Sequence, residues 1–104
     1  MMDGVFIERR MELGEASEVV LRFAFPVEHG QDFRCQYDIM WSSGIHSTRI
    51  FFGVDAVQAL ILAMKAAHSE LLASTEARSG QLQWLGTPDL GLPLPDGLTP
   101  KDFE

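Results

Sequence analysis

The stretch that decides the fold is Phe52-Gly53-Val54-Asp55-Ala56-Val57-Gln58-Ala59-Leu60, where a strand ends and a helix begins. Asp55 is a good N-cap, because its carboxylate can accept hydrogen bonds from the free N–H groups of the first helical turn. Gln58 stands three residues later and is expected to reach back to the N–H of Asp55, which completes a capping box. The stretch therefore marks a strand-to-helix junction, and it contains no catalytic constellation.

The residues after this junction have the spacing of an amphipathic helix from about Asp55 to about Arg78, ended by Ser79 and Gly80. Its sheet-facing positions are predicted to be Val57, Leu60, Ile61, Met64, His68, Leu71, Leu72 and Thr75. A strip of small residues lies beside this face and comprises Ala59, Leu62, Ala63, Ala66 and Ala73. Such a strip allows close approach of another element. The sequence leaves open whether that element is the C-terminal tail or a second copy of the chain.

The residues before the junction alternate between apolar and polar side chains, which is typical of half-buried strands. Four strands are expected, at residues 5–13, 18–27, 32–41 and 46–54. The inward positions are predicted to be Val5, Ile7, Met11, Leu13, Val19, Leu21, Phe23, Phe25, Phe33, Cys35, Tyr37, Ile39, Trp41, Ile50, Phe52 and Val54. Arg9 breaks the alternation, so a bulge or a side chain that extends its charged end to solvent is expected there. The short connections imply an antiparallel meander with one packed and one solvated face.

The end of the chain is predicted to be irregular after a short fifth strand at residues 81–85. From Gly86 onward, prolines and glycines favour an extended tail on the body, with apolar contacts from Leu90, Leu92 and Leu94. The prediction is one α+β domain over residues 1–104, with a core at 4–85 and a tail at 86–104. Its order is β-β-β-β-α-β, in an antiparallel sheet of four to five strands with one long helix packed on one face.

Composition disfavours several classes of protein. The chain has 104 residues, with 15 Asp and Glu against 8 Lys and Arg, and a net charge of −7. This balance disfavours nucleic acids and anionic membranes as partners and favours a basic protein. No stretch approaches the roughly 20 apolar residues of a membrane span, and Met1-Met2-Asp3-Gly4 lacks the features of a signal peptide. Cys35 is the only cysteine, so no intramolecular disulfide can form and a cytoplasmic location is expected.

Residues that could perform chemistry are few. His29, His46 and His68 have no metal-ligand spacing with another His, Cys, Asp or Glu, and no phosphate-binding loop or nucleophile elbow is present, so neither a metal nor a cofactor is expected. His68 is expected to be buried and hydrogen-bonded. The alternative, a catalytic base, requires Cys35 or a serine within reach. Cys35 alternates with aromatic residues, which indicates a packed and unreactive thiol.

Four motifs stand out along the chain: Glu8-Arg9-Arg10, Cys35-x-Tyr37, Gly53-x-Asp55-Ala56-x-Gln58-Ala59-Leu60 and Trp84-Leu85-Gly86. Together they resemble a family of small uncharacterised bacterial proteins, over roughly residues 5 to 93. The resemblance implies the same fold and a bacterial origin. It implies no activity and carries no site residue to this chain.

The solvated face of the sheet is the best candidate for a functional surface. Arg10, Arg22, Arg34 and Arg49 are expected to project from it, together with Asp38. One interpretation is a lattice of cross-strand charge pairs, each worth about 0.2–1 kcal/mol. The other is a recognition surface, because arginine binds carboxylates through two nitrogens at once and is common at interfaces. These five residues are the predicted binding site.

The sequence favours a small non-catalytic protein-binding module, such as an immunity-type or accessory adaptor protein, that acts through this face. The alternative is a small-molecule binder or minor enzyme, with a site between helix and sheet near Tyr37, Trp41, His68 and Trp84. Binding of nucleic acid through the arginines is least favoured, because the net charge is negative.

Overall fold

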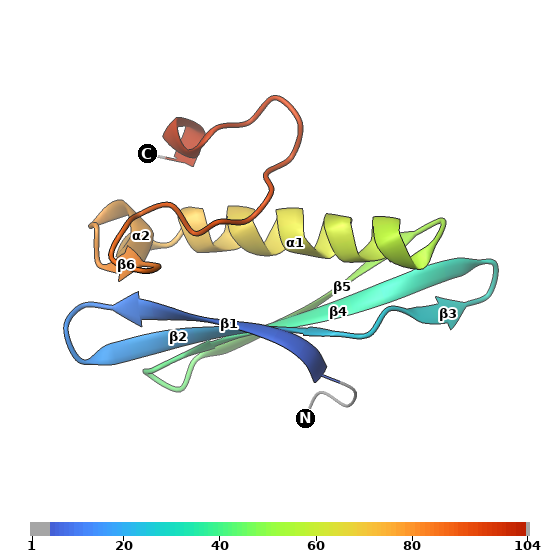
Figure 1. Ribbon diagram of the computed structural model, residues 1–104, viewed down its shortest axis with the longest axis horizontal. Coiled ribbons are helices and arrows are strands. Elements are labelled where there is room, and N and C mark those ends of the chain that lie inside the picture. The colour runs from blue at the N-terminus through green and yellow to red at the C-terminus, as the bar shows by residue number, and fades with distance from the viewer. Residues whose placement is uncertain (1–4, 104) are drawn as a thin grey trace.

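The computed structural model describes residues 5–103 and has two layers, a twisted antiparallel sheet and a long helix that crosses one of its faces (Figure 1). The strands are β1 (Val5–Leu13), β2 (Ser17–Ala24), β3 (Val27–His29), β4 (Asp32–Trp41), β5 (His46–Gly53) and β6 (Leu82–Gln83). The helical elements are α1 (Ala56–Leu72), α2 (Thr75–Arg78) and a C-terminal 3₁₀ helix, η1 (Pro100–Phe103). The predicted α+β class with an antiparallel sheet and one long helix is confirmed.

The strands form the expected meander. β5 pairs with one edge of β4, whereas β2 and β3 pair with the other edge in succession. β1 pairs with the other edge of β2, and β6, which comes after the helices in the chain, pairs with β1. The predicted second strand over 18–27 is divided into β2 and β3, because Pro26 has no N–H to continue the ladder.

The helix predicted over 55–78 is interrupted after Leu72. The hydroxyl of Ser74 donates a hydrogen bond to the Leu71 carbonyl and accepts one from the Ala77 N–H, so Ser74 ends one helix and caps the next. At the start of α1, Asp55 accepts the N–H of Gln58 at 2.8 Å, as predicted. The Gln58 amide oxygen instead accepts the N–H of Val54 at 2.7 Å, one residue before the expected partner.

The packed side of α1 has alanines in its first half and larger side chains at its end, where His68, Leu71 and Leu72 are buried. Ala59, Ala63 and Ala67 are fully buried, whereas Val57 is 65% exposed and Ile61 is 40% exposed. The prediction that Ala59 and Ala63 lie on a strip beside the sheet-facing side is therefore wrong, as is the inward placement of Val57 and Ile61. The inward placement of Leu60, Met64, His68, Leu71 and Leu72 is confirmed. Helical periodicity showed that one face is packed, but the larger side chains mark that face only in part.

The close approach of helix and sheet explains this arrangement. Tyr37 and Phe51 are stacked at 5.9 Å between ring centroids, and both belong to the packed face of the sheet. At the junction, a Cβ on Gly53 would lie 2.4 Å from the backbone nitrogen of Ala59. Bulky strand side chains and a glycine contact thus favour small residues at Ala59, Ala63 and Ala67.

The orientation of β5 differs from the prediction. Arg49 is opposite Tyr37 and Phe51 is opposite Cys35, so both share the packed face of those β4 residues. Ile50 and Phe52 therefore lie on the other face and are exposed. The Phe51-Phe52 pair supplies an aromatic ring to each face, so apolarity alone does not select the orientation. Their predicted inward placement is wrong, as is that of Val54 and Phe25, which are also exposed.

The core otherwise follows the predicted alternation. Its members from β1, β2 and β4 are Met11, Val19, Leu21, Phe23, Cys35, Tyr37 and Ile39. The side chain of Val5 lies outside the described part of the structure. In the tail, Leu90 is fully buried, and Leu92 and Leu94 pack against the core. None of the helices within residues 5–103 has the length and apolarity needed to cross a membrane.

Candidate functional site

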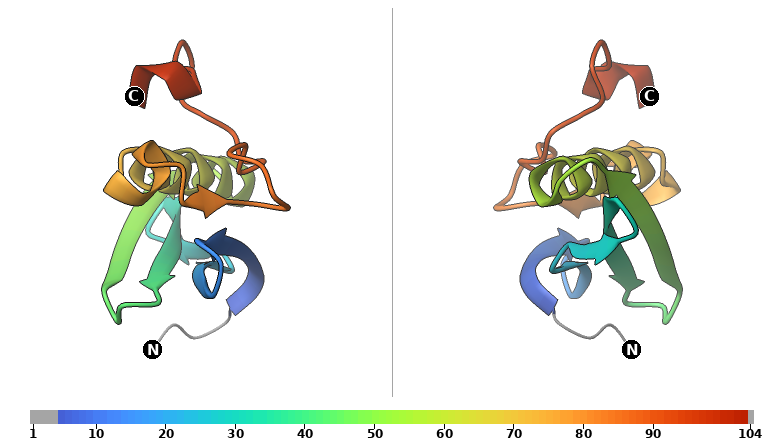
Figure 2. Two further views of the ribbon diagram at one scale, coloured as in Figure 1. Left: turned by 90° about the vertical axis from the view of Figure 1, so that its left-hand side faces the viewer. Right: turned by 90° about the vertical axis from the view of Figure 1, so that its right-hand side faces the viewer.

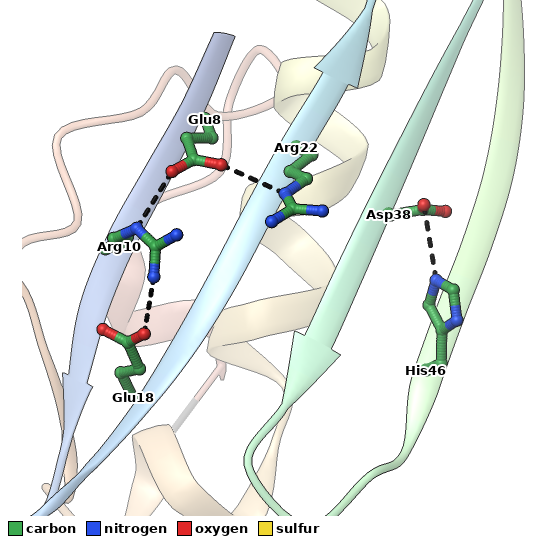
Figure 3. A network of polar contacts seen from close by, with 6 residues as sticks. All are labelled: Glu8, Arg10, Glu18, Arg22, Asp38 and His46. Carbon is green, nitrogen blue, oxygen red and sulfur yellow. Dashed lines mark hydrogen bonds and ion pairs between the residues drawn. The ribbon is translucent and has the colours of Figure 1, made fainter. Parts of the chain in front are cut away.

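The face of the sheet opposite α1, here called the outer face, is left open by the described residues. Figure 2 shows that both helices and the C-terminal segment gather on the other side of the sheet. On β1 and β2 the outer face carries a chain of ion pairs (Figure 3). Glu8 accepts hydrogen bonds from Arg10 at 2.9 Å and Arg22 at 3.0 Å, and Arg10 also donates to Glu18 at 2.6 Å. Two predicted binding residues, Arg10 and Arg22, therefore have intramolecular partners.

Asp38 is also engaged within the chain. It is only 4% exposed, although it belongs to the outer face of β4. Its carboxylate accepts a hydrogen bond from the Thr48 hydroxyl at 2.5 Å. It also lies 3.3 Å from Nε2 of His46, as Figure 3 shows for this pair. These contacts connect β4 to β5, and they leave little of Asp38 for a partner.

Arg49 lies on the helix side of the sheet, so its predicted place on the outer face is wrong. Its Nε donates to Glu70 of α1 at 3.0 Å, and the Tyr37 hydroxyl donates to the same oxygen at 2.7 Å. Burial raises the pKa of Glu70, but hydrogen bonds from Ser47, Tyr37 and Arg49 together bring that pKa below its usual value. Burial, followed by the bond to Glu70, raises the pKa of Tyr37. This cluster attaches α1 to the sheet, and it depends on the orientation of β5, which the sequence did not reveal.

Arg34 is in a different position from the other arginines. The cross-strand register places it between Val27 of β3 and Phe52 of β5, which are 45% and 50% exposed. The ring of His29 lies 5.3 Å from that of Phe52, and Ile50 is exposed two residues before Phe52. Within residues 5–103, the Arg34 guanidinium has no hydrogen-bond or ion-pair partner. We call Val27, His29, Arg34, Ile50 and Phe52 the Arg34 patch.

The residues of the alternative helix–sheet site are packed or engaged. Tyr37 is fully buried, and Nδ1 of the buried His68 lies 3.1 Å from the Pro93 carbonyl oxygen, as expected of a hydrogen-bonded core histidine. Burial lowers the pKa of His68 below its usual value. Burial also raises the pKa of the Cys35 thiol to about 11, which keeps it protonated and unreactive. Among the described residues, no group of three His, Cys, Asp or Glu side chains could hold a metal ion.

Arg9 fixes the tail rather than extending to solvent. Its guanidinium donates to the carbonyls of Leu90 at 2.8 Å and Gly91 at 3.0 Å, and it lies 3.8 Å above the Trp84 ring. Gly91 adopts φ +66°, and a Cβ there would lie 2.4 Å from the Trp84 ring. The break in the β1 pattern therefore marks the position where the C-terminal segment is bound.

The first and last of the four motifs are brought together by these interactions. The Glu12 carboxylate, close to Glu8-Arg9-Arg10, accepts the N–H groups of Leu85 and Gly86 at 3.3 and 2.8 Å. Arg9 meets Trp84 on the same edge of the sheet. The first and last motifs thus hold the tail, and the glycine-containing motif forms the junction of β5 and α1.

The model of the family described as Domain of unknown function (DUF6968) matches residues 7–94. The chain belongs to this family. No curated protein and no solved structure matches the chain. The DUF6968 region contains all four motifs and extends to Leu94, so it includes the tail segment that Arg9 and His68 contact.

Proposed function

We propose that the chain is a non-catalytic protein-binding module that recognises its partner through the Arg34 patch. The observation that carries the proposal is the environment of Arg34 on the open outer face. In the described structure, this exposed guanidinium has no acidic partner and is flanked by two exposed apolar side chains. Arg10 and Arg22 on the same face already bind Glu8.

An arginine next to aromatic and aliphatic side chains has the composition of an interface hot spot. A carboxylate of the partner would pair with Arg34, while Val27, Ile50 and Phe52 exclude water from that pair. A partner that used Arg10 or Arg22 would first have to break their bonds to Glu8. The Arg34 patch therefore offers binding energy without that cost.

The overall charge supports a basic partner. A net charge of −7 steers basic proteins toward the molecule, while the patch fixes the orientation of the complex. An immunity-type or accessory adaptor protein fits these features. We also propose a cytoplasmic setting, which the buried, free Cys35 supports, and a bacterial source, which the resemblance of the four motifs supports.

The experiment is affinity capture with the tagged protein from a lysate of its own source. The wild type is compared with an Arg34→Ala/Phe52→Ser double variant and with Arg10→Ala, a control on the same face. We expect one stoichiometric basic partner to be retained by the wild type and the control and lost by the double variant. Retention by a folded double variant would contradict the proposal.

A further inference from the structure

A cavity of about 370 Å³ opens where the end of α1, α2 and the C-terminal segment meet. Its floor includes Leu72, Leu82 and Leu90, which are buried core residues. Pro88 and Phe103 contribute to its walls, together with Arg78. The volume falls in the range of small-molecule sites, and the lining is mainly apolar. In Figure 1, η1 and the preceding loop stand on the far side of the helices from the sheet.

Arg78 is the charged residue of this lining. Its guanidinium has no hydrogen-bond or ion-pair partner within residues 5–103. The carboxylates next in the chain to the lining residues form other hydrogen bonds: Glu76 accepts from the Thr75 hydroxyl, Asp89 from the N–H of Gly91, and Asp102 from the N–H of Thr99. The cavity thus combines apolar walls with one guanidinium that is paired with no carboxylate of the described residues.

We propose that this cavity binds a small amphipathic anion, a carboxylate on a short aliphatic or aromatic body. The leucines, Pro88 and Phe103 would bury the apolar body, and Arg78 would bind the carboxylate through charge-assisted hydrogen bonds. This site shares no residue with the Arg34 patch. Phe103 also lies beyond the family match at residues 7–94, so the cavity wall includes a part of the chain outside the DUF6968 region.

The test uses octanoate and its neutral counterpart octanol, titrated into the full chain and followed by NMR of the leucine methyl groups. We expect saturable shifts of Leu72, Leu82 and Leu90 with octanoate, and weaker binding of octanol. Arg78→Gln should weaken octanoate about tenfold or more, because a hydrogen bond to a charged group is lost, and should leave octanol unchanged. Arg34→Gln is the matched control and should change neither affinity.

Phe103→Ala provides a second variant that keeps the charge, and it should weaken both ligands. The absence of saturable shifts at the three leucines would overturn the proposal. Equal affinity of octanoate for the wild type and Arg78→Gln would overturn the role of the charge. Either failure leaves the capture experiment on the Arg34 patch unaffected, because the two experiments change different residues.

Discussion

Replacing Gly53 with alanine is expected to destabilise the protein by about 3 kcal/mol, because it adds one methyl group where β5 meets α1. The new Cβ would lie 2.4 Å from the nitrogen and 2.9 Å from the Cα of Ala59. Both atoms are backbone in the first turn of the helix, so no side chain can rotate to relieve the contact. Overpacking in a rigid site costs about 1–3 kcal/mol, and we expect the upper end here.

The assay is urea unfolding followed by circular dichroism, with thermal unfolding as a second measurement. At about 4–8 °C per kcal/mol for a domain of this size, the melting temperature should fall by about 12–24 °C. Gly14→Ala is the control, because a Cβ there has no neighbour within 4 Å and φ is +64°, so only backbone strain of about 1 kcal/mol is added. A loss for Gly53→Ala no larger than that of the control would refute the account of a tightly packed junction.

Three further changes test the contacts around the core. Arg9→Met removes two hydrogen bonds to the tail and the stacking on Trp84, so we expect a loss of about 2 kcal/mol and faster proteolysis within residues 86–94, read by mass spectrometry. The lowered pKa of His68 means that the unfolded chain binds more protons below about pH 6.5, so the free energy of unfolding should decrease from pH 7.5 to about pH 5.5. His68→Gln should remove that part of the pH dependence in thermal unfolding, and an unchanged slope would contradict the assignment. Tyr37→Phe removes one donor to Glu70 and should cost about 1–2 kcal/mol in urea unfolding and raise the pKa of Glu70 in an NMR titration.

The sequence correctly predicted the strands in which the alternation of apolar and polar residues allows only one orientation. In β4, Cys35, Tyr37 and Ile39 alternate with polar residues, and all three are fully buried. In β5, Ile50 and Phe52 were wrongly predicted to face inward, because the adjacent Phe51 and Phe52 fit either orientation of the strand. The contact of Gly53 with the helix backbone fixes the orientation that the strand adopts. That contact joins two elements and has no signature in local periodicity.

The prediction of the packed face of the helix was wrong in its first half for a related reason, whereas His68, Leu71 and Leu72 at its end are buried as predicted. Ala59, Ala63 and Ala67 are packed because β4 and β5 supply large rings to the interlayer space, so burial depends on the partner surface and not on side-chain size alone. Arg9 was recognised as an irregularity, but its partners, Leu90 and Gly91, lie near the other end of the chain.

The candidate site was predictable only in part. Arg10 and Arg22 lie on the outer face as expected, and their bonds to Glu8 correspond to the lattice of charge pairs. Arg49 was misplaced together with the rest of β5 and binds Glu70. The environment of Arg34 depends on β3, a separate strand of three residues, of which the sequence analysis placed only Val27 in a strand.

Amide hydrogen exchange of the protein with and without its captured partner tests the central claim most directly. The account predicts that the partner slows exchange in β3 and in the Ile50-Phe51-Phe52 segment of β5, around Arg34. Exchange on α1 and in the tail should change little. Protection confined to α1 or to the C-terminal segment, with β3 and β5 unchanged, would contradict binding through the Arg34 patch.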